Sequence, residues 1–459
     1  MNMQFDSIII GTGQAGPALA ERLAQAGQKV AIIERKRFGG TCVNTGCIPT
    51  KTLVASAYAA QLARRGADYG VMIDGQIRVD MKRVKARMDA VADTASANVE
   101  KWLKGLANVT VIEGHARFES ADTVRVNSDV LQAGQIFINV GGRAMVPPMP
   151  GLEQVEYLTN SSIMDVDFLP EHLIIIGGSY IGLEFAQIYR RFGAQVTVVE
   201  KTPQIIGRED SDVSQCVADI LRKEGIRIET AAECMTVEKR GAQIAVKLDC
   251  AEGAREVLGS HLLLAVGRVP NTDDLGLDKA GVTLDERGYV AVNASLRTAV
   301  PGIWALGDCN GRGAFTHTAY NDFEIVADNL LKSESRSVDD RIMAYGLFVD
   351  PPLGRVGMSE DEIRKSGRRA LVGKRLMTRV GRAIEKGETL GFMKIAVDAD
   401  THEILGAAIL GVGGDEAVHC LLDVMYAKAP YTVLQRAVHI HPTVAELIPT
   451  VLGDLKPMD

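Results

Sequence analysis

Short apolar runs that end in glycine-rich turns recur along the chain and predict buried strands of a parallel sheet. The first run, Phe5–Ile10, leads into a helical stretch and then into a second strand-like run, Lys29–Ile33. Continuous apolar runs of about 4–8 residues between turn signals are typical of strands that are buried on both faces. The same order returns far downstream, with apolar runs at 173–176 and 195–199 on either side of a helical stretch. The pattern therefore predicts two β–α–β units.

Each unit carries glycines in the turn after its first strand and an acidic residue at the end of its second strand. The residues are Gly11, Gly13, Gly16 and Glu34 in the first unit and Gly177, Ser179, Gly182 and Glu200 in the second. Both acids come 23 positions after the first glycine, and the two units are offset by 166 residues. Such glycines let the backbone approach a pyrophosphate at a helix N-terminus, and the acid accepts from a ribose hydroxyl. The repeat therefore predicts two dinucleotide sites, in the second of which Ser179 either bonds a phosphate oxygen or crowds it.

Two Pro/Gly-rich crossings, Gly141–Gly151 and Ala265–Asn271, indicate domain boundaries. Beyond the second crossing, a strand-like run ends at Asp308 and leads to a helical stretch at 318–331. The sequence predicts an α/β protein with two Rossmann-like dinucleotide-binding domains and a third, C-terminal α+β domain. The crossings divide the chain near residues 145 and 270.

The last part of the chain, from about Tyr345, carries no nucleotide motif. Strand-like alternation at 393–397 and 404–410 is followed by helical stretches at 415–427 and 432–437. This mixture of periods is the reason for assigning an α+β domain rather than a third dinucleotide unit.

Composition and charge narrow the functional classes. The 459 residues are 46% hydrophobic and 24% charged, which is ordinary for a globular protein of several domains. A net charge of −7 with acidic and basic residues interspersed disfavours a nucleic-acid or anionic-membrane partner. Seven cysteines without framework spacing disfavour a secreted disulfide scaffold. Because no signal-like or membrane-length apolar run is present either, we expect a cytoplasmic protein without a membrane partner.

Cys42 and Cys47 carry the most information about chemistry, because they follow the first glycine turn closely within a glycine-rich stretch. In an ideal helix, residues five apart have Cα atoms about 8.6 Å apart, whereas a disulfide needs roughly 4.4–6.8 Å. If the two cysteines bridge, the backbone between them is distorted, and Gly46 and Pro49 permit such a distortion. The pair predicts thiol–disulfide redox chemistry beside a dinucleotide, against the alternative of two buried free cysteines.

Taken together, these features resemble the pyridine nucleotide–disulfide oxidoreductases over essentially the whole chain. The stretch 39–49, the two dinucleotide units, the Gly307-Asp308 motif and the pair His441 and Glu446 occur in that family's order. This flavoenzyme family includes glutathione reductase, dihydrolipoyl dehydrogenase and mercuric reductase. The stretch Cys42–Leu53 is most similar to a mercuric-reductase-like branch.

The resemblance implies that the first unit binds FAD and the second binds NAD(H), with NADP(H) left open. The residues implied for FAD are Gly11, Gly13, Gly16, Glu34, Gly40, Thr41, Lys51, Ala116, Asp308, Thr316 and His317. The residues implied for the nicotinamide nucleotide are Gly177, Ser179, Gly182, Glu200 and Gly267. No metal ligand is assigned.

The resemblance also implies distinct roles for the two cysteines. Cys47 is expected to be the thiolate that lies against the flavin, and Cys42 the exposed thiol that attacks the substrate. Lys51 and Glu184 match the family's ion pair near the flavin.

His441 is the expected acid–base group, with Glu446 as its carboxylate partner. A thiolate, not a thiol, is the nucleophile, so the cysteine pair needs a nearby base or positive potential. Histidine titrates near neutrality, and a carboxylate can orient it. In this family the histidine and glutamate come from the other subunit, so the resemblance implies a homodimer whose C-terminal domain is the dimerisation domain. It also implies that residues 1–145 with 271–338 form the FAD-binding domain, residues 146–270 the nicotinamide-nucleotide domain and residues 339–459 the dimerisation domain.

The expected function is an FAD-dependent oxidoreductase that passes electrons from NAD(P)H to the Cys42–Cys47 disulfide and on to a small-molecule or protein disulfide. One alternative is a metal-ion reductase of the mercuric type, and another is a transhydrogenase or diaphorase. Typical mercuric reductases carry a cysteine pair near the C-terminus, whereas the last cysteine here is Cys420 and His441 is present. The intact cysteine pair argues against a diaphorase as the main role.

Overall fold

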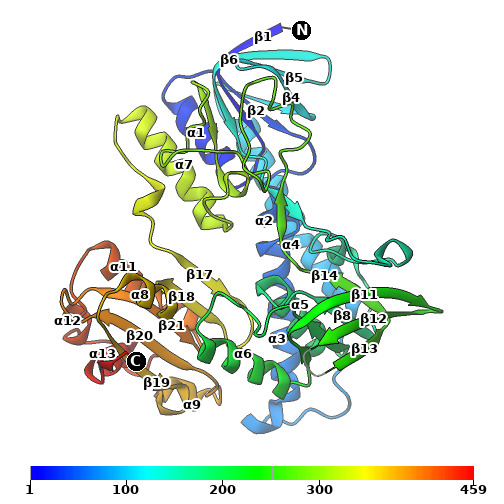
Figure 1. Cartoon of the computed structure of the whole chain (residues 1–459), viewed down its shortest axis with the longest axis vertical. Coiled ribbons are helices and arrows are strands. Elements are labelled where there is room, and N and C mark those ends of the chain that lie inside the picture. The colour runs from blue at the N-terminus through cyan, green and yellow to red at the C-terminus, as the bar shows by residue number, and fades with distance from the viewer. Residues whose placement is uncertain (1, 251–252, 459) are drawn as a thin grey trace.

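A parallel sheet forms the centre of the N-terminal part of the chain (Figure 1). In this computed structural model, which describes residues 2–250 and 253–458, the parallel strands run in the order β3-β2-β1-β6-β16. They are β1 (Asn2–Ile10), β2 (Val30–Glu34), β3 (Val109–Glu113), β6 (Asp129–Ile138) and β16 (Ile303–Ala305). An antiparallel pair, β4 (Ala116–Ser120) and β5 (Thr123–Val126), extends the sheet from β6.

Both faces of this sheet are buried, as its continuous apolar runs predict. Ile8 faces a core that it shares with the β4–β5 pair, whereas Ile9 faces a core that includes α1 (Gly16–Gln25) and α7 (Thr316–Leu331). Strand β16 joins the sheet from beyond the second Pro/Gly-rich crossing, so this part of the fold is assembled from two separate stretches of sequence.

A second parallel sheet repeats the β–α–β arrangement. Its strands run in the order β10-β9-β8-β14, and a separate antiparallel sheet, β11-β12-β13, covers one of its faces. The parallel strands are β8 (His172–Ile176), β9 (Gln195–Val199), β10 (Arg227–Glu229) and β14 (His261–Leu264). The antiparallel strands are β11 (Ala232–Arg240), β12 (Gln243–Cys250) and β13 (Gly253–Gly259). Helices α5 (Tyr180–Phe192) and α6 (Ser211–Lys223) cover the opposite face.

The two predicted crossings pair with each other. Strand β7 (Gly142–Ala144) and strand β15 (Arg268–Pro270) run antiparallel, so the chain enters and leaves the second sheet through one two-stranded connection. The boundaries at these crossings were indicated by proline and glycine content, but their pairing needs the folded chain.

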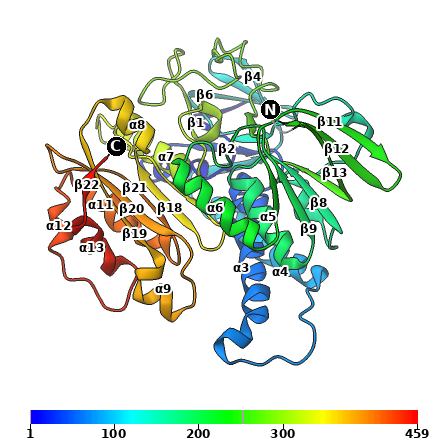
Figure 2. The ribbon, with the colours of Figure 1, turned by 60° about the horizontal axis from the view of Figure 1, so that its bottom comes forward.

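Helices α2 (Gly40–Asn44) and α3 (Cys47–Arg64) follow strand β2, and α4 (Met81–Gly105) runs alongside α3. Figure 2 shows α3 projecting from the body of the molecule. Leu53 and Ala57 of α3 also pack into the core beneath α5, so α3 joins the two parallel-sheet regions. None of the helices within residues 2–250 and 253–458 is long and apolar enough to cross a membrane.

The C-terminal part is an antiparallel sheet with helices, in the order β17-β18-β21-β20-β19-β22. Its strands are β17 (Ala344–Leu347), β18 (Leu353–Gly357), β19 (Ala370–Leu376), β20 (Phe392–Asp398), β21 (Ile404–Leu410) and β22 (Lys456–Pro457). The two predicted strands are present as β20 and β21. The predicted helix 415–427 is wrong in one respect, because the chain breaks it at Val418 into α10 (Gly414–Ala417) and α11 (His419–Tyr426).

Helix α12 (Thr432–Gln435) is two residues shorter than predicted. Ala437 N–H bonds the carbonyl of Leu434, a tighter turn than the α-helix makes, and the chain then leaves as an extended tail. Helix α13 (Ile448–Gly453) follows that tail. The tail between α12 and α13 contains His441.

Candidate active site

The turn between β1 and α1 has no room for a side chain at Gly11 or Gly16. A Cβ at Gly11, where φ is +106°, would lie 2.3 Å from the carbonyl oxygen of Asn139, and a Cβ at Gly16 would lie 2.3 Å from that of Gly11. No side chain caps the N-terminus of α1, so its first N–H groups stay free of side-chain partners. Close backbone approach and free N–H groups are what a pyrophosphate needs, so this turn fits a dinucleotide.

The turn between β8 and α5 repeats these contacts almost atom for atom. A Cβ at Gly177, with φ of +113°, would lie 2.3 Å from the carbonyl oxygen of Ala265, and a Cβ at Gly182 would lie 2.0 Å from that of Gly177. Ser179 takes the N-cap position of α5 in an extended conformation, and its side chain makes no capping hydrogen bond. The serine that departs from the glycine pattern thus leaves the helix N-terminus uncapped, like that of α1.

The acid at the end of each second strand points back to its glycine turn. Glu34 Oε2 accepts from the backbone N–H of Thr12 at 3.1 Å and from its hydroxyl at 2.6 Å. Glu200 Oε2 accepts from the N–H of Gly178 at 2.7 Å, and its Oε1 accepts from the N–H of Thr202 at 2.8 Å. These bonds hold both carboxylates beside the glycine turns. The predicted contact of each acid with a ribose hydroxyl stays a prediction.

Cys42 and Cys47 lie on opposite sides of a break between two helices. Cys42 belongs to α2 and Cys47 begins α3, with Thr45 and Gly46 outside helical geometry. A Cβ at Gly46 would lie 2.8 Å from the carbonyl oxygen of Thr41 and 3.3 Å from Cys42 Cα, so only glycine lets the chain fold back this closely. The distortion that the spacing requires is therefore made at Gly46, and Pro49 lies in the first turn of α3, where proline is tolerated.

The two thiols ionise in different pH ranges. A hydrogen bond from Cys42 stabilises the Cys47 thiolate most. The Thr316 hydroxyl, at 3.2 Å, and the charge of Lys51 stabilise it further. Together they lower the pKa of Cys47 to about 6, although burial opposes the shift. The hydrogen bond to Cys47, burial and the Cys47 charge all raise the pKa of Cys42 far above its usual range. Proton loss therefore begins at Cys47, and Cys42 needs a base to become a nucleophile.

In this single chain, the relative exposure of the two cysteines is the reverse of what their expected roles require. Cys47 is exposed and Cys42 is half-buried. The expected roles concern the FAD-loaded dimer, and the assignment of Cys42 as the exposed thiol stays a prediction. Three other cysteines, for which the sequence suggested no role, have pKa values raised by burial: Cys216, Cys309 and Cys420.

We expect the Cys47 thiolate to be present above a pH of about 6 and to be lost as the pH falls through that value, because its pKa is lowered to about 6. Thr316→Val removes a hydrogen bond to the thiolate and should move the midpoint upward, whereas Thr94→Val, whose hydroxyl bonds the Ala90 carbonyl in α4, should not. The measurement is the ultraviolet thiolate absorbance of the reduced protein as a function of pH. The absorbance of the Cys47→Ser variant at the same pH is subtracted. A midpoint near 8.5, about that of an ordinary thiol, would contradict the expectation.

The predicted ion pair between Lys51 and Glu184 is present. Lys51 Nζ lies 2.7 Å from Glu184 Oε2, and only 5% of the Glu184 side chain is exposed. Lys51 is one helical turn after Cys47 in α3, and Glu184 lies in the first turns of α5. The ion pair therefore connects the helix of the cysteines with the helix that follows the second glycine turn. The buried carboxylate of Glu184 can keep the ammonium group of Lys51, with its positive charge, close to the cysteines.

Arg268 is a charged residue at this site to which the sequence analysis assigned no role. Its guanidinium lies 3.6 Å from Asp308 Oδ2 and 3.4 Å from the hydroxyl of Thr41, and it also donates to the carbonyl of Gly142. Burial raises the pKa of Asp308, and the Arg268 charge opposes this. Arg268 thus connects two of the residues implied for FAD with the two-stranded crossing.

The remaining predicted residues come from several elements. His317 bonds the carbonyl oxygen of Ala344 at 2.7 Å, and burial lowers its pKa. A Cβ at Gly40 would lie 2.9 Å from Gly13 Cα, so these two glycines meet. Ala116 starts β4 within the core, and Gly267, with φ of +132°, lies between β14 and β15.

His441 and Glu446 form the predicted pair. Nδ1 of His441 lies 2.9 Å from Glu446 Oε2, while 78% of the His441 side chain is exposed and only 15% of the Glu446 side chain is. Figures 1 and 2 place α12 and α13, which flank His441, on the outer side of the C-terminal part, away from α3. The imidazole is therefore oriented by the carboxylate and is largely exposed in this single chain.

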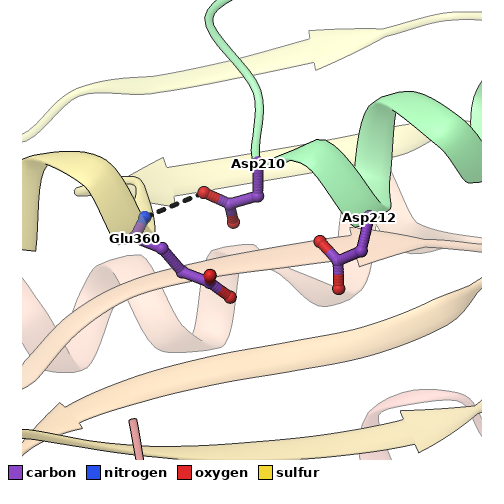
Figure 3. Close-up of side chains that lie close together, drawn as sticks. All are labelled: Asp210, Asp212 and Glu360. Carbon is purple, nitrogen blue, oxygen red and sulfur yellow. Dashed lines mark hydrogen bonds between the residues drawn. The ribbon is translucent and has the colours of Figure 1, made fainter. Parts of the chain in front are cut away.

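Three carboxylates converge at the contact between α6 and the C-terminal sheet: Asp210, Asp212 and Glu360 (Figure 3). Lys394 Nζ lies among them, 2.9 Å from Asp210, 2.6 Å from Asp212 and 2.7 Å from Glu360. The ammonium group of Lys394 takes the position in which a metal ion would have to bind. This cluster is an ion-pair network rather than a candidate metal centre.

Comparison with known proteins agrees with this geometry. Residues 5–322 match the family model described as pyridine nucleotide-disulphide oxidoreductase, and residues 343–452 match that family's dimerisation domain. The chain belongs to the pyridine nucleotide-disulfide oxidoreductase family. It is therefore an enzyme of a family whose members use FAD and pyridine nucleotides, and its C-terminal α+β part is the dimerisation domain.

Relatives of this family extend over nearly the whole chain. A probable pyridine nucleotide-disulfide oxidoreductase, RclA of Escherichia coli, is 36% identical and covers 96% of this chain and 97% of its own length. A dihydrolipoyl dehydrogenase of Thermus scotoductus is 33% identical (96% and 95%), and a mercuric reductase of Streptomyces lividans is 31% identical (97% and 94%). The solved structure described as the Cu(II) complex of the HOCl-induced flavoprotein disulfide reductase RclA of Escherichia coli has a TM-score of 0.90 at 35% identity, covering 99% of each chain.

Proposed function

We propose that this enzyme passes electrons from NADH through FAD to the Cys42–Cys47 pair and on to a disulfide acceptor, as a homodimer. The observation that carries the proposal is the break at Gly46, which brings the two cysteines together with opposite changes in pKa. FAD, when bound, supplies two-electron transfer between the nicotinamide and the cysteine pair. The family relationship and the retained His441–Glu446 pair support a disulfide as acceptor.

The proposed sites follow the two glycine turns. FAD is assigned to the turn of Gly11, Gly13, Gly16 and Glu34, together with Gly40, Thr41, Lys51, Ala116, Asp308, Thr316 and His317. The nicotinamide nucleotide is assigned to Gly177, Ser179, Gly182, Glu200 and Gly267. The proposed domains are residues 1–145 with 271–338 for FAD, 146–270 for the nicotinamide nucleotide, and 339–459 for the dimer contact.

In the proposed reaction, His441 of the partner subunit takes the proton of Cys42. The Cys42 thiolate attacks one sulfur of the substrate disulfide, forming a mixed disulfide, and the released thiolate takes the proton back from His441. The Cys47 thiolate then attacks the Cys42 sulfur, which releases the second substrate thiolate and leaves the Cys42–Cys47 disulfide. FAD held at the turn of Gly11, Gly13 and Gly16 would supply the two electrons, taken from NADH, that return this disulfide to the dithiol. A base is required because the pKa of Cys42 is raised by the hydrogen bond to Cys47 and by burial.

An acceptor panel tests the proposal. The purified dimer is assayed with NADH against oxidised glutathione, lipoamide, Hg(II), Cu(II) and quinones, and disulfides should be reduced with the highest kcat/KM. Cu(II) and Hg(II) belong in the panel because relatives are described as a Cu(II) complex and as a mercuric reductase. Faster reduction of a metal ion or quinone than of every disulfide would replace the proposed acceptor.

We expect kcat/KM to be higher with NADH than with NADPH. The Glu200 carboxylate, held by the N–H groups of Gly178 and Thr202, can accept from the free 2′-hydroxyl of NADH, and its charge repels a 2′-phosphate. Glu200→Gln should reduce the preference, whereas Glu171→Gln, an exposed acid in the same region, should leave it unchanged. Steady-state rates with both nucleotides measure the ratio, and a higher kcat/KM with NADPH would refute this role for Glu200.

A further inference from the structure

The three residues after strand β17 are fixed on one face of helix α5. The N–H of Phe348 donates to Glu184 Oε1 at 3.1 Å, and the N–H of Asp350 donates to Gln187 Oε1 at 2.7 Å. The Asp350 carboxylate also pairs with Arg191 at 2.7 Å. Positions 184, 187 and 191 lie on one face of a helix, so α5 holds this segment at three successive points. The segment, residues 348–350, therefore has a defined position relative to α5.

The ring of Phe348 lies beneath the ammonium group of Lys51. Lys51 Nζ is 4.5 Å from the ring centroid, while the same atom is 2.7 Å from Glu184 Oε2. Gly346 lies against the ring, since a Cβ there would be 3.2 Å from Cε2 and Cζ of Phe348. An ammonium over an aromatic face is attracted by the ring, and the attraction is greater where water is excluded. The ammonium of Lys51 is thus held between a ring and a carboxylate.

We propose that Phe348 is a positioning residue for the redox site: its ring and its N–H together hold the Lys51–Glu184 pair where the Lys51 charge favours the Cys47 thiolate. The side chain of Lys51 is 34% exposed, so without the ring it can turn toward solvent. Glu184, only 5% exposed, would stay with its negative charge unbalanced. Both changes act against the thiolate. Phe348 follows a strand of the C-terminal sheet and contacts Lys51, which lies close to the cysteines of the N-terminal part.

Among the described residues of one chain, the groups that shift the ionisation of Cys47 come from four elements. Cys42 of α2 and the Thr316 hydroxyl of α7 donate to it, Lys51 is on its own helix, and Glu184 is on α5. The hydrogen bond from Cys42 lowers the pKa of Cys47 most; Lys51 lowers it further, and Glu184 raises it. A displacement of Lys51 relative to Glu184 therefore changes the ionisation of Cys47 without any change at the sulfur itself.

The test is the pH midpoint of Cys47 ionisation in the FAD-loaded dimer, measured in a Cys42→Ser background by thiolate absorbance and corrected with the Cys42→Ser/Cys47→Ser protein. Phe348→Leu should raise the midpoint by about half a pH unit. Phe348→Tyr keeps a ring and should leave the midpoint in place. Gly346→Ala, which displaces the ring without replacing it, should raise the midpoint in the same direction. In a Lys51→Met background, Phe348→Leu should add no further change.

Two results would overturn the proposal. One is an unchanged midpoint in both Phe348→Leu and Gly346→Ala, and the other is an equal rise with and without Lys51. The second result would point to a general loosening of the fold, which a double-mutant cycle separates from a contact with Lys51. The functional meaning of the shift rests on the proposed role of Cys47, but the measurement needs no acceptor. A failed acceptor panel would therefore leave this result standing.

Discussion

His441→Ala should lower disulfide reduction by about 10²–10⁴-fold, while the transfer of electrons from NADH to FAD survives. The loss is expected because the pKa of Cys42 is raised by its hydrogen bond to Cys47 and by burial, so attack on the substrate needs a base. The residual activity should increase with pH, as Cys42 then ionises without help. Stopped-flow measurement of the two half-reactions separates the effects, and Glu446→Gln should give a milder loss of the same kind, since its carboxylate orients the imidazole at 2.9 Å.

Mixed dimers and a neighbouring histidine provide the controls. A dimer that combines a His441→Ala subunit with a Cys42→Ser subunit keeps one complete site if the base comes from the partner, and it should retain part of the activity. His439→Ala, two residues upstream in the same tail, should leave both half-reactions close to those of the parent enzyme. Equal losses of both half-reactions in His441→Ala would identify a structural histidine instead.

Cys47→Ser should abolish disulfide reduction, with a loss on the order of 10³-fold or more, because a hydroxyl cannot replace a thiolate that is formed near neutral pH. The thiolate of Cys47, with its pKa lowered to about 6, should also give the two-electron-reduced protein a long-wavelength absorbance beside FAD. That absorbance should be absent in Cys47→Ser. In Cys42→Ser it should be present even before reduction, since Cys47 then has no disulfide partner.

Cys216→Ser is the matched control for these variants. Cys216 is half-buried in α6, and burial raises its pKa, so its replacement should change neither the absorbance nor the rate. A long-wavelength absorbance that survives in Cys47→Ser would assign the thiolate to another residue. The same absorbance in Cys47→Ser but not in Cys42→Ser would exchange the roles of the two cysteines.

The features that sequence predicts well are those that short stretches of chain encode. The two glycine turns and their acids lie within one β–α–β unit each, so their spacing alone indicates tight turns at Gly11 and Gly177. The residues that crowd these glycines, Asn139 and Ala265, come from outside the units. The continuous apolar runs likewise predict strands buried on both faces. The break between Cys42 and Cys47 follows from the length of a disulfide compared with the rise of a helix.

The features that sequence does not reveal are contacts between distant stretches. Arg268 reaches Asp308 and Thr41 only because the two crossings pair, and Phe348 reaches Lys51 only because α5 holds the segment after β17. Neither residue has a motif around it that periodicity could detect. The helix break at Val418 also has no signal in the apolar pattern, which continues through it.

The position of Lys394 among Asp210, Asp212 and Glu360 has a consequence for how the enzyme can be handled and where it can work. Three carboxylates this close repel one another unless a cation lies among them, and a cation taken from the medium could be removed by a chelator. Here the cation is covalently part of the chain. The junction between α6 and the dimerisation domain is therefore complete as soon as the chain has folded, whatever the metal supply of the surroundings.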